Sequence, residues 1–212
     1  MESASNLITK VESGLPWVRK RALNNLVKLG SSAVKEIITA LDTPYAPVLM
    51  KSISSTRPEE FNESNIARKI WPFLIDALVQ IGKPALEELE NSLNHPNPNV
   101  RISAMETIGK IGHPSAVDML LPFLKSDERG WAIVALGFTR SPRVYEVIVS
   151  TLEDKTIDQD FAIEALGVLG DIRALPILEK IAVSYKKLDG RYGFEKRTVV
   201  DEAIKSIQKE NE

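Results

Sequence analysis

The chain has 212 residues, a hydrophobic fraction of 43% and a formal net charge of −2. It contains no cysteine, which excludes disulfides, thiolate catalysis and metal sites built from cysteine. The near-neutral charge gives no general reason to expect nucleic acid or an anionic membrane as a partner. No uncharged apolar run approaches the roughly 18 residues of a membrane span, and the first residues do not resemble a signal peptide. We therefore expect a cytoplasmic protein.

The first element is a short amphipathic segment over residues 3–13. Its apolar residues Leu7, Ile8 and Val11 are spaced to share one face of a helix. Repeat arrays need atypical end elements to cover their cores, so this segment predicts an N-terminal capping helix.

A repeat begins directly after this segment. Residues 16–30 (PWVRKRALNNLVKLG) align without gaps with residues 98–112 (PNVRISAMETIGKIG), and the match retains Pro, Val, Arg, Ala, Lys and Gly. Weaker copies end at Gly82, Arg140 and Gly170. A recurring unit of about 30 residues is the mark of a solenoid built from stacked repeats.

Within one unit the apolar residues have helical spacing. Val100, Ala104 and Ile108 lie at i, i+4 and i+8, which is one stripe of a 3.6-residue period. Gly112 then supplies the left-handed residue that ends a helix, and Pro114 begins the next one. Each unit therefore predicts a hairpin of two amphipathic helices, and no stretch shows the alternation of a β-strand.

These patterns predict an all-α fold, a right-handed α-solenoid of about five helical hairpins with terminal capping helices, in a single domain over residues 1–212. A cluster of proline and serine predicts an insertion that separates the first two repeats. The predicted ranges are 15–43, 62–95, 97–126, 127–154 and 157–185 for the repeats, 194–208 for the C-terminal cap and 44–61 for the insertion.

The motifs of these units resemble HEAT repeats. The resemblance lies in the Val-Arg pair ahead of a small residue, the closing Leu-Gly pairs and the Asp/Pro-rich turns, and it covers residues 15–43 and 62–208. More narrowly, the 30-residue unit is similar to the short HEAT-like class named from phycobilisome lyases. The resemblance implies a helical solenoid and leaves the function open, because such repeats are reused for many partners.

The residues that could carry chemistry do not form a recognisable active site. The two histidines, His95 and His113, each precede a proline in a turn and make a poor metal site without cysteine. The glycines occur singly, and no nucleophile elbow is present. We therefore expect no catalytic, cofactor or metal site, and a non-enzymatic protein more than an enzyme.

Three arginines recur near the start of the first helices, at Arg19, Arg101 and Arg129. They could form a basic ladder along one edge, or each could pair with an acidic turn residue of a neighbouring repeat. We favour the second interpretation, because the arginine belongs to the repeat pattern itself.

The second helices carry the main functional prediction. In HEAT-type arrays they line the concave face, and the helical period leaves one set of their side chains pointing outward. This predicted partner-binding surface consists of Glu87, Asn91, Asp118, Met119, Pro122, Glu146, Val147 and Lys180. It is mildly acidic and partly apolar, which suits a protein or peptide with basic and apolar residues and disfavours a nucleic-acid backbone.

A second candidate surface is the segment between the last repeat and the C-terminal cap. It combines basic and aromatic residues, a composition that can grip phosphates, and its members are Lys186, Lys187, Arg191, Tyr192, Lys196 and Arg197. The other interpretation is a long turn whose cations stay solvated.

The predicted function is therefore a non-enzymatic interaction or scaffold module that binds a protein partner in its concave groove. One alternative is a lyase- or chaperone-like protein that holds a tetrapyrrole or its acceptor protein, as the resemblance implies. A second alternative is nucleic-acid binding. The sequence does not identify the partner or an oligomeric state.

Overall fold

The computed structural model describes residues 2–12, 15–42, 66–154, 156–188 and 190–212. Every regular element in these ranges is an α-helix or a 3-10 helix, and none of them is a strand. The prediction of an all-α fold is therefore confirmed. The predicted insertion at 44–61 lies outside the described residues.

The described residues form two compact units, unit 1 up to Ile111 and unit 2 from Gly112 to Glu212. Neither unit tests the prediction of a single repeat domain, which stays a prediction. The elements of unit 1 are α1 (Ala4–Val11), α2 (Pro16–Leu29), α3 (Ser31–Leu41), α4 (Ile66–Ile81), the 3-10 turn η2 (Lys83–Ala85), α5 (Leu86–Ser92) and α6 (Pro98–Ile111).

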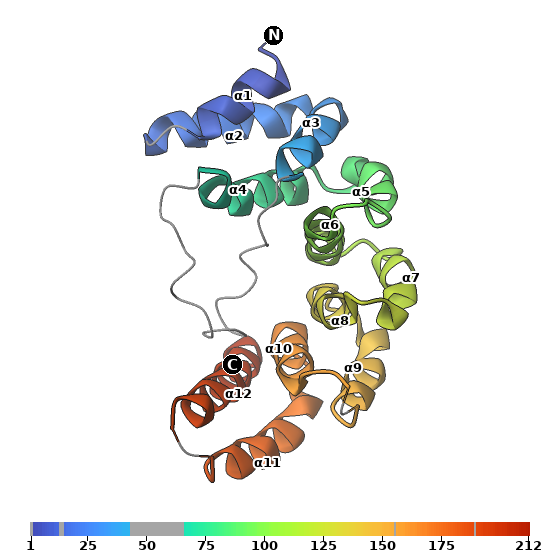
Figure 1. The fold of residues 1–212 in the computed structure, drawn as a ribbon, viewed down its shortest axis with the longest axis vertical. Helices are drawn as coiled ribbons and strands as arrows, with labels where there is room; N and C mark the ends of the chain where they lie inside the picture. The colour runs from blue at the N-terminus through green and yellow to red at the C-terminus, as the bar shows by residue number, and fades with distance from the viewer. Residues whose placement is uncertain (1, 13–14, 43–65, 155, 189) are drawn as a thin grey trace. The chain divides into compact units, whose positions relative to one another are not determined.

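The predicted N-terminal capping helix is present as α1, which packs against α2 and α3 (Figure 1). The Ser3 hydroxyl begins the helix by accepting a hydrogen bond from the Asn6 backbone N–H at 3.3 Å. Leu7, Ile8 and Val11 are buried, as predicted. Burial of one such side chain stabilises a fold by about 1.5–3 kcal/mol, so α1 closes this end of the core.

Unit 2 contains the second helix of one hairpin, two complete helical hairpins and a long final helix. Its elements are α7 (Ala116–Leu120), η3 (Leu121–Lys125), α8 (Arg129–Phe138), η4 (Pro142–Val144), α9 (Tyr145–Thr151), α10 (Gln159–Leu169), η5 (Ile172–Ala174), α11 (Leu175–Tyr185) and α12 (Gly190–Glu210). The final helix begins four residues earlier than the predicted cap at 194–208. Gly193 permits this, because a Cβ at that position would collide with the carbonyl oxygen of Leu188.

The first helix of each hairpin ends at a residue in the left-handed region. Four of these residues are glycines with φ between 59° and 73°, namely Gly30, Gly82, Gly112 and Gly170. The fifth is Arg140, with φ 51°, the only described non-glycine residue with positive φ. The positions that mark the repeat in the sequence therefore share a positive φ, even where glycine is replaced, although ψ differs between Gly30 (−137°) and Gly170 (10°).

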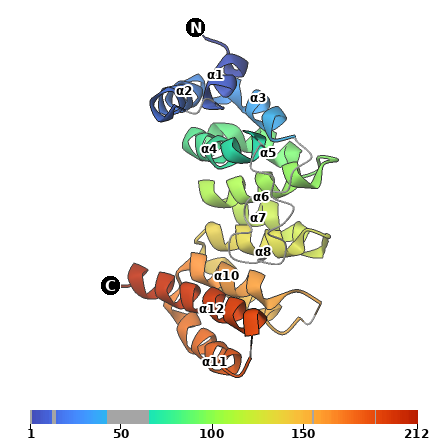
Figure 2. The same ribbon diagram turned by 60° about the vertical axis from the view of Figure 1, so that its left-hand side comes forward.

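The first helices of unit 2 form a closely packed layer of α8, α10 and α12 (Figures 1 and 2). Gly137 on α8 faces Ala165 of α10 so closely that an added Cβ would lie 2.5 Å from the Ala165 carbonyl oxygen. Gly167 on α10 faces Ala203 of α12, where the corresponding distance to Cα is 2.7 Å. The glycines of the Leu-Gly pairs thus allow neighbouring backbones to approach, in addition to any role at helix ends.

Candidate functional site

The eight residues predicted on the second helices are distributed over both units. Glu87 and Asn91 lie on α5 in unit 1, and both are exposed. The other six lie in unit 2: Asp118 and Met119 on α7, Pro122 on η3, Glu146 and Val147 on α9, and Lys180 on α11. The structure therefore brings Asp118 and Glu146 into one unit, whereas Glu87 belongs to the other.

The second helices of unit 2, which carry these six residues, form a row of their own beside its first helices. In Figure 1, α7, α9 and α11 follow the outside of the layer formed by α8, α10 and α12. We expected the second helices to line a concave side. A concave groove is a property of the whole array and stays a prediction; within unit 2, the glycine contacts show a close backbone approach between neighbouring first helices.

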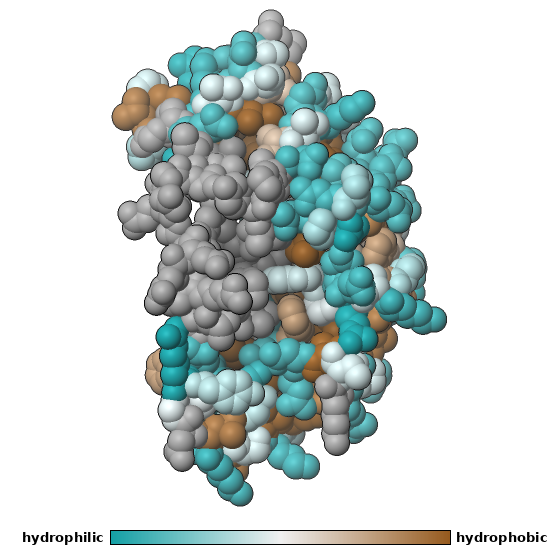
Figure 3. All heavy atoms as spheres, in the orientation of Figure 1, coloured by the Kyte–Doolittle hydropathy of each residue, from teal (hydrophilic) through white to brown (hydrophobic). Residues whose placement is uncertain are grey.

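The carboxylates in this outer row are ion-paired. Arg143 Nη2 lies 2.8 Å from Asp118 Oδ1, and Arg173 Nη1 lies 3.8 Å from Glu146 Oε1. Arg173 also contacts Asp171, with 2.6 Å between Nη2 and Oδ2. We refer to Asp118, Arg143, Glu146, Arg173 and Asp171 as the charge ladder. Hydrophilic and hydrophobic residues are interspersed on the face of unit 2 that Figure 3 shows.

Sequence reasoning missed the two arginines of the ladder. Arg143 and Arg173 each precede the first buried residue of a second helix, Val144 and Ala174. The equivalent positions of these two arginines in their repeats could have identified them. We counted the outward positions of each second helix only from its first buried residue onward, so the arginines were not included. Within unit 2, the mildly acidic surface predicted from the sequence therefore also carries arginines paired with its carboxylates.

Arg173 is the best-anchored member of the ladder. Its guanidinium lies 4.0 Å from the centroid of the Tyr145 ring, and the Tyr145 hydroxyl donates to the Arg173 carbonyl at 2.9 Å. Hydrogen bonds from Arg173 lower the pKa of Asp171 below its usual range, although partial burial opposes the effect. Exposed pairs of this kind contribute about 0–1 kcal/mol, so the ladder shapes a surface more than it stabilises the fold.

The predicted phosphate-contacting segment is largely used for internal contacts. Lys196 is buried and lies 2.6 Å from Asp158 Oδ1 and 2.9 Å from Asp160 Oδ1. Arg197 donates to the carbonyl oxygens of Tyr185 and Leu188 at 3.3 and 2.6 Å. These two cations hold the turn against the helices and are not offered to a ligand.

The remaining members of this segment are exposed. Arg191 pairs with Glu195 at 2.8 Å, and Lys186, Lys187 and Tyr192 face solvent. The other interpretation, a long turn with solvated cations, holds only for Lys186 and Lys187, because the members from Arg191 to Arg197 belong to α12 and Lys196 is buried.

Burial and ion pairing have opposite effects on Lys196. Burial alone would lower the pKa of its ammonium group, but the hydrogen bonds to Asp158 and Asp160 outweigh burial and raise it. For Asp160, burial is the largest effect and raises the pKa of its carboxyl. This cluster joins the start of α10 to α12, and we therefore assign it a structural role.

The recurrent arginines bind turns through backbone oxygens. Arg19 donates to the Val11 carbonyl at 3.1 Å, Arg101 to the His95 carbonyl at 2.7 Å, and Arg129 to the Thr156 carbonyl at 2.7 Å. We expected acidic partners in these turns. Hydrogen bonds from Thr156 lower the pKa of Asp154 and the charge of Arg129 adds to this effect, so Arg129 also has an acidic neighbour in its turn. The carbonyl contact is common to all three arginines.

The two histidines have local roles. The Nδ1 atom of His95 accepts the Asn97 backbone N–H at 3.1 Å, and that of His113 lies 2.9 Å from the Ser115 hydroxyl. Within the described ranges, no three His, Asp or Glu side chains are grouped as metal ligands. In the same ranges, no helix is both long and apolar enough to cross a bilayer.

Comparison with known proteins identifies the repeat. A model of HEAT repeats matches residues 73–136 and 86–160. The crystal structure of an engineered protein from the Northeast Structural Genomics Consortium is similar at 18% identity and a TM-score of 0.43, covering 99% of this chain and 98% of that chain. No curated protein matches the sequence. HEAT repeats generally mediate protein–protein interaction or scaffolding. Residues 73–160 therefore match HEAT repeats, within a chain whose described regular elements are all helical.

Proposed function

We propose that this protein is a non-enzymatic interaction or scaffold module that binds a protein partner along the outward row of its second helices. The charge ladder is the observation that carries this proposal. It displays fixed charges at regular intervals, and the half-buried side chains of Met119 and Val147 lie beside it on α7 and α9. Extended surfaces of this type bind by many modest contacts with a few dominant anchors.

The ladder favours a partner with basic and apolar residues. The Glu146 side chain is 82% exposed, and its contact with Arg173 spans 3.8 Å, so one oxygen remains open to a cation of the partner. Asp118 is also exposed and accepts a single arginine. A partner lysine or arginine can therefore join an existing pair without leaving a buried charge, and Val147 offers an apolar contact next to Glu146.

Photo-crosslinking in the native cell tests this proposal. A photoreactive residue placed at Ser150 or Lys180, on the outward side of α9 and α11, should capture the same protein partner. The matched control is Gln208, an exposed position on α12. Equal capture from Gln208, or no capture from Ser150 and Lys180, would place the binding surface elsewhere.

Charge reversal then tests the acidic members. The triple variant Glu87→Lys, Asp118→Lys and Glu146→Lys should slow association with the captured partner and change its salt dependence, because charge steers the encounter. Reversal of Glu12, Asp201 and Glu202, three exposed acids elsewhere, is the control for net charge. The same loss in both variants would mean that overall charge, and not the predicted surface, governs binding.

A further inference from the structure

The outward face of α2 is an unusual surface in unit 1. Lys20, Arg21, Asn24 and Lys28 are exposed along this face, and Trp17 is 67% exposed at its start. The spacing follows the helical period, so the five side chains form one stripe. We refer to them as the α2 face. α2 contains four basic residues and no acidic residue.

Three cations of the α2 face have no partner among the residues that the structure describes. Lys20, Arg21 and Lys28 form no ion pair or hydrogen bond with any part of the described chain. Arg19 behaves differently, since it lies over the Phe73 ring at 4.5 Å and binds the Val11 carbonyl. The stripe is therefore separate from the arginine that belongs to the repeat.

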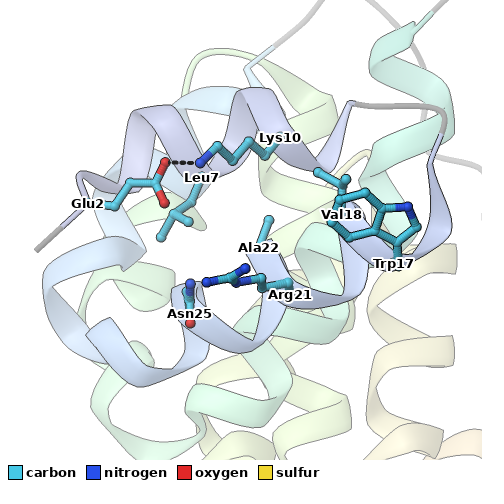
Figure 4. A pocket seen from close by; sticks show the side chains of 8 residues that line it. All are labelled: Glu2, Leu7, Lys10, Trp17, Val18, Arg21, Ala22 and Asn25. Carbon is cyan, nitrogen blue, oxygen red and sulfur yellow. Dashed lines mark ion pairs between the residues drawn. The ribbon is translucent and has the colours of Figure 1, made fainter.

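Clefts adjoin the α2 face. One of about 320 Å³ lies between α1 and α2, and another of about 460 Å³ lies over α2 itself; both are lined by Trp17, Arg21 and Asn25. Figure 4 shows Leu7 of α1 opposite Arg21 and Asn25, with Trp17 at one end of the first cleft. Lys10 of α1 is paired with Glu2 along its rim. An apolar floor thus lies beside the cations of the α2 face.

The corresponding face of α6 is covered. In the alignment of the repeats, Lys20, Arg21 and Asn24 correspond to residues 102, 103 and 106, all of which are buried. The α2 face is therefore the position at which a further element packs in an interior repeat. A polar end face is normal for a terminal repeat. Solubility alone does not explain an exposed tryptophan among several charges of the same sign.

We propose that the α2 face binds an acidic segment of a protein partner, with an apolar side chain of that segment in the α1/α2 cleft beside Trp17. Charge complementarity identifies the occupant. The cations from Lys20 to Lys28 span about 12 Å of helix, which matches a few carboxylates and not a long polyanion. The chain as a whole carries a net charge of −2, so a nucleic acid would experience repulsion outside the stripe. This surface is distinct from the outward row of second helices, where acidic and basic side chains are paired.

A direct binding assay on the full chain tests the proposal. The probe is a fluorescein-labelled synthetic helix of about 15 residues, with glutamates on one face and a leucine at its centre, since about 15 residues equal the length of α2. Anisotropy should show saturable binding that weakens with salt, and acrylamide should quench Trp17 less in the complex. The variant Lys20→Glu, Arg21→Glu and Lys28→Glu should bind at least about 10-fold more weakly.

The controls separate the possible causes. The variant Lys186→Glu, Lys187→Glu and Lys205→Glu changes the net charge equally at exposed sites of unit 2 and should bind like the wild type. Trp17→Ala should also bind more weakly, while circular dichroism shows that each variant is folded.

Three results would overturn the proposal. They are no binding of the peptide, equal loss in both charge variants, or tighter binding of labelled oligothymidylate that depends on the same three cations. The last result would assign the α2 face to nucleic acid. None of these results bears on the crosslinking from Ser150 and Lys180.

Discussion

Replacing Gly137 by alanine would place a Cβ atom 2.5 Å from the carbonyl oxygen of Ala165 and 2.9 Å from its Cα. Ordinary contact begins near 3.4 Å, so α8 and α10 would have to separate by about 0.9 Å. The obstacle is backbone and cannot rotate away. A gap of about 0.5–1 Å forfeits a quarter to a half of the dispersion energy of each contact that it opens.

The expected cost follows from two opposing effects. Overpacking of this severity costs about 3 kcal/mol, at the upper end of its usual range. Alanine is favoured over glycine within a helix by about 1 kcal/mol, which offsets part of the loss. We therefore expect Gly137→Ala to lower the free energy of unfolding by about 2 kcal/mol. Urea unfolding followed by circular dichroism measures this difference.

Two other glycines serve as matched controls. At Gly130 the added Cβ would meet the ring of Phe161 at 2.7 Å, and a ring can move, so Gly130→Ala should cost little after the helical gain. At Gly30 nothing lies within 4 Å, and only the backbone conformation opposes alanine: φ 59° with ψ −137° is strongly disfavoured for residues with a Cβ and costs about 1–3 kcal/mol. A Gly137→Ala protein as stable as the wild type, or an equal loss at Gly130, would refute the close packing of α8 and α10.

Three further substitutions test the repeat and its electrostatics by the same unfolding measurement. Ala104→Asp should cost several kcal/mol, because Ala104 is buried and the new charge would have no partner; an equally stable variant would contradict the repeat alignment. Arg140→Gly should be more stable than Arg140→Ala by about 1 kcal/mol, since both lose the ion pair with Glu210 and only glycine relieves the positive φ; equal stability of the two would argue against that backbone conformation. Burial raises the pKa of the Glu106 carboxyl, and Lys110 lowers it by less, so ionisation of Glu106 destabilises the fold once the pH exceeds its folded pKa. Glu106→Gln should therefore be more stable than the wild type at pH 7, and this advantage should vanish below about pH 4, where the carboxyl is protonated in both states; a gain that persisted at low pH would point to a different cause.

The candidate surfaces show where sequence reasoning reached its limit. The outward residues of the second helices were predicted correctly as exposed at Asp118 and Glu146, because helical period decides exposure locally. Their arginine partners come from the following hairpin, 25 residues further along the chain for Asp118 and Arg143. The same limit applies to the C-terminal segment. Lys196 is buried and bonded to Asp158, 38 residues earlier in the chain, and helical period does not predict such a contact.

The sequence by itself determined the helical hairpins, the left-handed residue that ends each first helix and the capping role of α1. These features depend on helical period and on conformational preferences within a few residues. The tertiary structure alone decided the contact of Gly137 with Ala165, the pairing of Asp118 with Arg143 and the exposure of the α2 face. Each of these depends on how far apart neighbouring helices lie and how they are rotated. Such offsets of an ångström or less arise from the packing of whole helices, and the residue pattern of a single repeat does not contain them.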